Sequence, residues 1–187
     1  EPDEIEIYPD NFKSTKNIFY NDILCDVHRP HHFDGVITIV SELLKIVSPN
    51  KIYFGLKDYQ QFKIIEKLTE KKFSQIEIYG IETVRDENGL ALSSRNKLIN
   101  QPNKEIYKSF INSINEFVLS LNPDTKIKDA NELVEKFLQE NSYEIKKFEY
   151  HEFRSLEDLS LEGQIKNSRL FLAFYIHATR LIDNIKI

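Results

Sequence analysis

The sequence has 187 residues, a formal net charge of −5 and 41% hydrophobic residues, which is typical of a globular chain with a core and not of a disordered one. The acidic balance disfavours a general nucleic-acid-binding protein, because such a protein needs a broad basic face for phosphates. The single cysteine, Cys25, excludes an internal disulfide and suits a reducing cytoplasm. No apolar run approaches the roughly 18 residues that a membrane-spanning helix needs. We therefore expect a cytoplasmic protein with neither a membrane nor a nucleic-acid partner.

The chain begins with Glu-Pro-Asp-Glu, which is not a signal peptide, and it contains no methionine. We therefore expect a fragment, or a chain whose beginning is missing. A fragment of this kind would expose apolar sheet surface and tend to associate.

The first half of the chain alternates helical and strand patterns. Residues 36–47 carry apolar side chains at helical spacing before a proline stop, whereas residues 25–35 are expected to form a loop. A short apolar run at 52–54 stops at Gly55, a second helical pattern covers about 58–71, and another strand follows at 76–79. The order helix, strand, helix, strand predicts a parallel sheet.

The second half changes in character after a long loop at 84–96, whose turn is predicted at Asn88-Gly89. Asn100 is a predicted N-cap with Pro102 just inside the helix. Further on we expect helices at about 102–121 and 129–139 and strands at 148–153, 170–176 and 180–185. We predict two domains: an α/β domain over 1–99 and a small α+β domain over 100–187.

Polar side chains follow the strand at 52–54, at the sheet edge where open α/β proteins bind ligands. Lys57 could hold a phosphate as a flexible point charge, or could be a solvated surface lysine. Asp58 could accept hydrogen bonds from ribose hydroxyls, or could cap the following helix. Gln61 offers a donor and an acceptor to a hydroxy acid, or could be an exposed helical residue.

A second polar stretch contains Ser93, Ser94 and Arg95. Two hydroxyls beside a guanidinium group suit a polyphosphate, because donors and a fork-shaped cation would converge on anionic oxygens. The alternative is an ordinary capping loop.

Four potential metal ligands, Cys25, His28, His31 and His32, lie within eight positions. Their spacing matches no closed zinc motif, and a tetrahedral site is hard to build from adjacent histidines. We therefore expect no physiological metal site there, and a zinc or copper site at Cys25 and His28 is the alternative.

Taken together, several stretches resemble the pantothenate synthetase (pantoate–β-alanine ligase) family, in an order and spacing that run from about residue 7 to the C-terminus. These stretches are Arg29-Pro30-x-His32-Phe33-x-Gly35-Val36-x-Thr38-x-Val40, Phe54-Gly55-x-Lys57-Asp58-Tyr59-Gln60-Gln61, Val84-Arg85-Asp86-x-x-Gly89-Leu90-Ala91-Leu92-Ser93-Ser94-Arg95-Asn96 and Arg180-Leu181-Ile182-Asp183-Asn184.

The resemblance implies the C-terminal portion of a Rossmann-like nucleotidyltransferase domain, followed by a small α+β C-terminal domain. It implies an ATP-dependent condensation of pantoate with β-alanine through pantoyl adenylate, giving pantothenate, AMP and pyrophosphate. ATP would be a substrate accompanied by Mg²⁺, no metal would be bound by the protein itself, and the family commonly forms homodimers.

The resemblance also implies roles for individual residues. Gln61 would bind pantoate, and Lys57, Ser93 and Arg95 would carry the catalytic chemistry. The implied ATP-binding residues are Gly55, Leu56, Lys57, Asp58, Val84, Leu92, Ser93, Ser94 and Arg95.

Three departures from the family pattern stand out. The early His-x-Gly-His motif is absent, Leu56 stands where the family usually has glutamate, and residues 24–26 replace Leu-Glu-Gly while His31 replaces a glycine. We therefore expect this chain to lack full activity alone. The alternative is a truncated or diverged nucleotide-binding relative without ligase activity.

Overall fold

The computed structural model describes residues 13–141, 143–145 and 147–187, and the chain forms two compact units, Glu1–Glu82 and Thr83–Ile187. The boundary differs from the predicted one at 99/100, because the hairpin after Glu82 packs into the second unit. Leu90 and Ile99 belong to the core of that unit. None of the helices in the described part of the chain is both long and apolar enough to cross a membrane.

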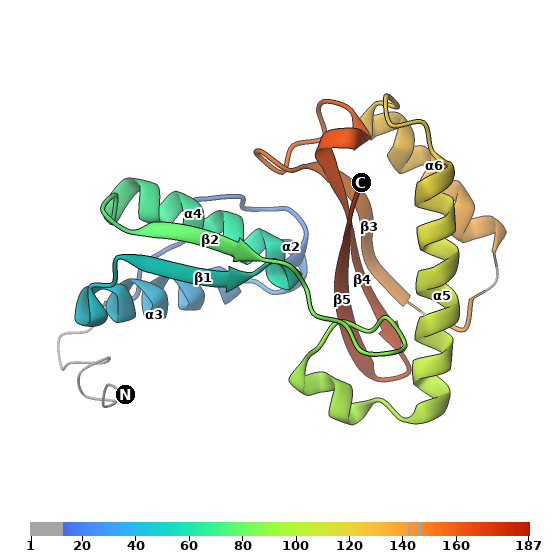
Figure 1. Cartoon of the computed structure of the whole chain (residues 1–187), viewed down its shortest axis with the longest axis horizontal. Helices are drawn as coiled ribbons and strands as arrows, with labels where there is room; N and C mark the ends of the chain where they lie inside the picture. Colours follow the sequence, from blue (N-terminus) through green and yellow to red (C-terminus); the bar gives the residue numbers. More distant parts are fainter. Residues whose placement is uncertain (1–12, 142, 146) are drawn as a thin grey trace. The chain divides into compact units, whose positions relative to one another are not determined.

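The first unit contains, among its described residues, two parallel strands joined by a helix (Figure 1). Gly55 lies opposite Ile81 in the register of the two strands, so both strands end at the same edge. Helix α4 connects the strands and buries Ile64, Ile65 and Leu68, while α3 packs against α4. The elements are α2 (Cys25–His28), α3 (His32–Val47), β1 (Lys51–Gly55), the 3₁₀ turn η1 (Leu56–Asp58), α4 (Tyr59–Lys72) and β2 (Glu77–Ile81). The predicted parallel α/β arrangement is confirmed.

The predicted loop at 25–35 is wrong, because most of this segment is helical in α2 and the first turn of α3. The buried side chain of Gln60 on α4 organises the segment from a distance. Its Oε1 accepts the backbone N–H of Cys25 at 3.0 Å, and its Nε2 donates to the carbonyl of Ile23 at 3.0 Å. A long-range contact of this kind leaves no local pattern in the sequence.

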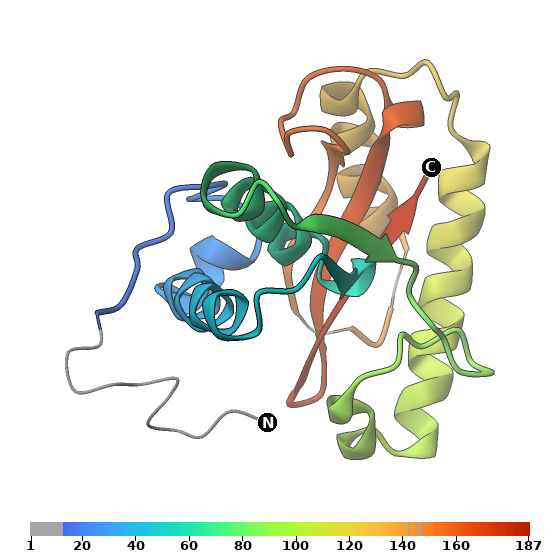
Figure 2. The same ribbon diagram turned by 60° about the vertical axis from the view of Figure 1, so that its left-hand side comes forward.

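The second unit packs two helices against an antiparallel sheet with the strand order β3-β4-β5 (Figure 2). Alternate residues of β4, including Leu172 and Phe174, are fully buried with the helices in one core. Phe110 of α5 contacts the ring of Phe174 edge-on at 5.0 Å. The elements are η2 (Ser94–Leu98), α5 (Gln101–Ser120), α6 (Ile127–Glu140), β3 (Lys147–Ser155), η3 (Ile165–Asn167), β4 (Ser168–Ile176) and β5 (Thr179–Lys186). The small α+β unit is confirmed.

Two local predictions in this unit are also confirmed. The side chain of Asn100 accepts the backbone N–H of Asn103 at 3.0 Å and so caps α5, with Pro102 in its first turn. Gly89 has a φ of 77°, a left-handed conformation that glycine adopts without steric cost, and it closes the predicted Asn88-Gly89 turn.

Candidate functional site

The first group of candidate residues forms a strand-end turn, which we define as Gly55–Asp58. It lies at the edge where β1 and β2 both end, the usual position of ligands in open parallel sheets. Asp58 occupies the N-cap position of α4, yet its side chain makes no capping hydrogen bond. The capping alternative for Asp58 is therefore not met by a hydrogen bond, and its carboxylate lies beside Lys57 instead. Gln61 lies in the first turn of α4.

The Lys57 side chain is 19% exposed, and its Nζ lies 3.6 Å from Oδ2 of Asp58. A fully solvated surface lysine would be far more exposed. The carboxylate holds the ammonium group close to the end of the strand, so the turn presents a cation and an anion side by side.

Leu56 has a structural role within this turn. Its side chain is 9% exposed and lies against Gly80 of β2, where a β-carbon added to the glycine would come within 2.5 Å of Leu56 Cδ2. Because the side chain packs inward, a ligand can contact Leu56 through its backbone. A backbone contact is the kind that tolerates leucine in place of the usual glutamate.

The contact between Leu56 and Gly80 gives a testable prediction. Gly80→Ala should lower the free energy of unfolding by about 1–3 kcal/mol, because the added methyl group would come within 2.5 Å of the buried Leu56 side chain and force it to shift. The cost should fall in a Leu56→Ala background, as urea unfolding of the single and double variants would show. Gly35→Ala is the control, since a β-carbon at Gly35 would meet nothing within 4 Å. Equal costs at Gly80 in both backgrounds would contradict the prediction.

The second group of candidate residues lies on a hairpin over 84–92 and on η2, which follows it. The N–H of Leu92 donates to the carbonyl of Val84 at 2.9 Å, and Arg85 pairs with Ala91 as an antiparallel bridge. This pairing places Val84 and Leu92 side by side, with exposed fractions of 63% and 54%. An exposed apolar pair of this kind suits the flat face of a nucleobase.

The serine–arginine turn, defined as Ser93–Arg95, continues directly from this hairpin. The hydroxyl oxygen of Ser93 accepts the backbone N–H of Arg95 at 3.3 Å, so the predicted capping alternative is also met. The Ser93 hydroxyl can still donate its proton to an anion. Ser94 is exposed and Arg95 half-buried. The turn therefore offers two hydroxyls and a guanidinium group beside the apolar pair.

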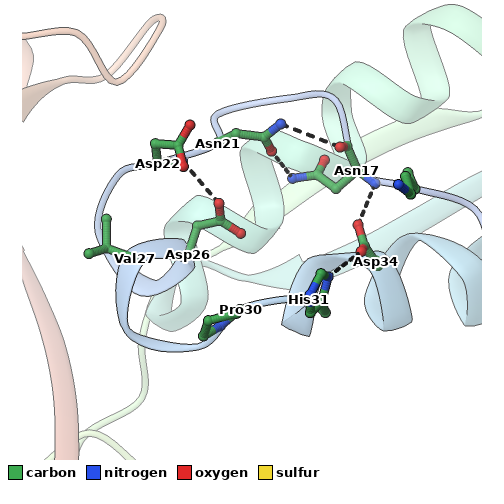
Figure 3. A pocket seen from close by; sticks show the side chains of 9 residues that line it. Asn17, Asn21, Asp22, Asp26, Val27, Pro30, His31 and Asp34 are labelled. Atoms are coloured by element: carbon green, nitrogen blue, oxygen red, sulfur yellow. Dashed lines mark hydrogen bonds and ion pairs between the residues drawn. The ribbon is translucent and has the colours of Figure 1, made fainter.

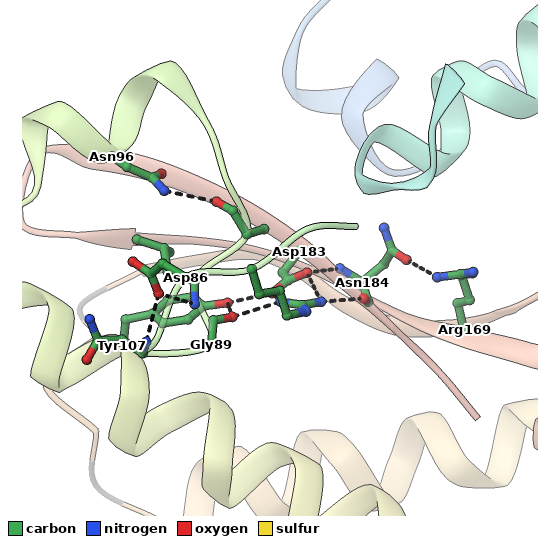
Figure 4. Close-up of polar contacts among 11 residues, drawn as sticks. Asp86, Gly89, Asn96, Tyr107, Arg169, Asp183 and Asn184 are labelled. Carbon is green, nitrogen blue, oxygen red and sulfur yellow. Dashed lines mark hydrogen bonds and ion pairs between the residues drawn. The ribbon is translucent and has the colours of Figure 1, made fainter. Parts of the chain in front are cut away.

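The hairpin is anchored by a buried carboxylate of β5 (Figure 4). Both Asp183 oxygens accept hydrogen bonds from the Arg85 guanidinium, at 2.6 and 2.8 Å, and Oδ2 also accepts the Tyr107 hydroxyl at 2.5 Å. Burial, followed by the Asp183 charge, raises the pKa of Tyr107 far above its ordinary value, so the phenol stays protonated and donates. Sequence reasoning assigned no role to these residues, although Arg85 and Asp183 lie in the quoted motifs.

A separate pocket of about 580 Å³ lies in the first unit (Figure 3). Two of its three carboxylates accept hydrogen bonds within the protein: Asp34 accepts the N–H of Asn17 at 2.7 Å, a bond that lowers the pKa of Asp34, and Asp26 accepts the N–H of Asp22. Among the described residues, no three His, Cys, Asp or Glu side chains are grouped as metal ligands. The pocket is lined by Lys16, Asn17, Asn21, Asp22, Asp26, Val27, Pro30, His31 and Asp34.

His31, at the rim of this pocket, has a φ of 64°. Left-handed backbone favours glycine, so a histidine in this conformation carries a steric cost. The Nδ1 atom of His31 lies 3.1 Å from Oδ2 of Asp34, which is in the first turn of α3.

Known proteins resemble this chain in sequence along nearly its whole length. The sequence profile described as pantoate-beta-alanine ligase matches residues 1–186. The pantothenate synthetase of Roseobacter denitrificans is 34% identical over 188 residues, and that of Aquifex aeolicus 36% over 191 residues. Each alignment covers 100% of this chain and 66% of the relative, so the chain spans about two thirds of the length of these relatives.

Solved structures show the same fold. The pantothenate synthetase of Thermus thermophilus superposes with a TM-score of 0.78 and 28% identity, covering 99% of this chain and 67% of that one. The Francisella tularensis pantoate-beta-alanine ligase, complexed with beta-gamma ATP and beta-alanine, gives a TM-score of 0.68 and 32% identity, covering 98% and 62%. The profile match along the whole chain, the sequence relatives and the shared fold together place this chain in the pantoate–β-alanine ligase family.

Proposed function

We propose that this protein catalyses the ATP-dependent condensation of pantoate with β-alanine through a pantoyl adenylate. The observation that carries the proposal is the presence, in the family fold, of both the strand-end turn and the serine–arginine turn with its apolar pair. The F. tularensis relative, complexed with beta-gamma ATP and beta-alanine, supports the substrate class.

In the first step, a pantoate carboxylate oxygen attacks the α-phosphorus of ATP and pyrophosphate leaves. Negative charge builds on the α-phosphate and on the leaving group, and fixed cations stabilise it. Lys57 and Arg95 supply those charges, and the hydroxyls of Ser93 and Ser94 donate to phosphate oxygens. Mg²⁺ would accompany ATP as part of the substrate and would neutralise part of the phosphate charge.

The remaining candidates orient the substrates. Val84 and Leu92 support the adenine ring, and the carboxylate of Asp58 accepts the ribose hydroxyls. The backbone of Gly55 and Leu56 approaches ATP, and the amide of Gln61 binds the hydroxyl groups of pantoate.

In the second step, the β-alanine amine attacks the acyl carbon of the mixed anhydride, the bond to AMP breaks, and the amine loses a proton. The adenylate is already activated, so this step depends chiefly on holding the amine close to the carbonyl.

The test separates the two steps in the complete gene product. Pyrophosphate release with ATP, Mg²⁺ and pantoate alone measures adenylate formation, and pantothenate formation on adding β-alanine measures ligation. We expect both activities. ATP binding without pyrophosphate release would instead support a nucleotide-binding relative that performs no ligation.

A further inference from the structure

In the second unit, the residues proposed to bind the nucleotide all lie on the 84–92 hairpin or directly after it. Val84 and Leu92 lie on the 84–92 hairpin, and the serine–arginine turn follows it. Arg85 of this hairpin donates both to the Asp183 carboxylate and, at 3.0 Å, to the carbonyl of Gly89 at the hairpin turn. The Arg85 guanidinium group therefore links the turn of the hairpin to β5 by hydrogen bonds.

The carboxylate that receives this guanidinium group is itself fixed. The Asp183 side chain is 1% exposed, and Oδ1 also accepts the backbone N–H of Asn184 at 2.7 Å. Tyr107 of α5 is likewise almost fully buried, and its hydroxyl donates to Oδ2 of Asp183. Hydrogen bonds to a charged group away from water are strong, and they hold their partners in one arrangement.

Further hydrogen bonds stiffen the hairpin and join the residues on either side of the serine–arginine turn. Asp86 Oδ1 accepts the N–H of Leu90 at 3.0 Å, which stiffens the hairpin, and Asn96 Nδ2 donates to the carbonyl of Ala91 at 3.1 Å (Figure 4). A shift of the hairpin would therefore move the turn that continues from it.

We infer that Asp183, Arg85 and Tyr107 are positioning residues that fix the serine–arginine turn for its anionic ligand. This inference rests on the proposed function. The three residues act through the turn, and a displacement of about 1 Å in a positioned group can cost orders of magnitude in rate.

The test compares two tyrosine-to-phenylalanine variants of the same core. Tyr107→Phe removes the hydroxyl that donates to Asp183, and Tyr143→Phe removes a hydroxyl that bonds to Ser113 at 2.8 Å, away from the hairpin. Amide hydrogen exchange over 86–96 reports how firmly the hairpin and the turn are held, and the affinity for ATP in the absence of the other substrates reports whether the turn binds its anionic ligand. We expect Tyr107→Phe to speed exchange there and to weaken ATP binding roughly tenfold, as for loss of one bond to a charged group. Tyr143→Phe should do neither.

Asp183→Asn is a second variant, which retains the shape of the side chain but removes its charge. It should repeat the effect of Tyr107→Phe. Equal exchange over 86–96 in the Tyr107 and Tyr143 variants would overturn the inference, and so would faster exchange with unchanged ATP affinity. Failure of the unaltered protein to bind ATP would reject the proposed function, while the exchange comparison would still decide whether the anchor positions the turn.

Discussion

Replacement of Lys57 by alanine is expected to lower pantoyl adenylate formation by roughly 10²-fold or more, the usual cost of one lost charge stabiliser. The side chain is largely buried just after β1 and lies beside Asp58, so its ammonium group is held at the edge of the sheet where the proposed function places a phosphate. Pyrophosphate release with saturating pantoate and ATP measures the effect. The turn itself should survive, because Leu56 anchors it against Gly80.

Lys67→Ala is the matched control for this experiment. Lys67 also lies in the first unit, on α4, and its Nζ pairs with Glu70 at the surface, at 2.7 Å. Its removal should leave adenylate formation unchanged. Near-normal pyrophosphate release by Lys57→Ala would remove Lys57 from the mechanism, whereas a loss shared with Lys67→Ala would indicate a general effect of charge.

Arg95→Ala is expected to reduce adenylate formation to a similar extent, roughly 10²-fold. The guanidinium group follows the serine hydroxyls and can form two parallel hydrogen bonds with phosphate oxygens. Arg95→Lys should recover part of the activity, because lysine retains the charge but loses the fork-shaped geometry. Pyrophosphate release again provides the measurement.

The control for Arg95 lies in the same 3₁₀ turn. Lys97 is exposed in η2, so Lys97→Ala removes a neighbouring positive charge without touching the serine–arginine turn. It should have little effect on the rate. Full activity of Arg95→Ala, or equal losses in both variants, would contradict a specific role for Arg95.

Local sequence patterns predicted much of the fold for physical reasons. The apolar run that stops at Gly55 and opens into a helical pattern predicted β1 and α4, and Asn100 predicted the start of α5. Hydrophobic periodicity, turn residues and caps act over a few positions, so they can be recognised along the chain. The loop predicted at 25–35 failed because Gln60, on another helix, organises that segment.

For the candidate site, too, local patterns gave some features and long-range packing gave others. Lys57, Asp58, Ser93 and Arg95 were proposed from chemical type and local context, and their roles stay predictions. The domain boundary predicted at 99/100 differs from the structure because the hairpin after Thr83 belongs, by its packing, with the second unit.

The parallel α/β arrangement, the turn at Gly89 and the polar groups proposed to meet the nucleotide could be predicted along the chain, because each depends on neighbouring residues. The contacts that hold those groups in place could not, because they arise only when distant segments pack together. Arg85 and Asp183 are separated by 98 positions in the sequence. The hydroxyl of Tyr107, on α5, also donates to Asp183, but the helical pattern around Tyr107 predicts only that this residue is buried. Such a buried polar network depends on which side chains the fold brings together, and no local pattern encodes that.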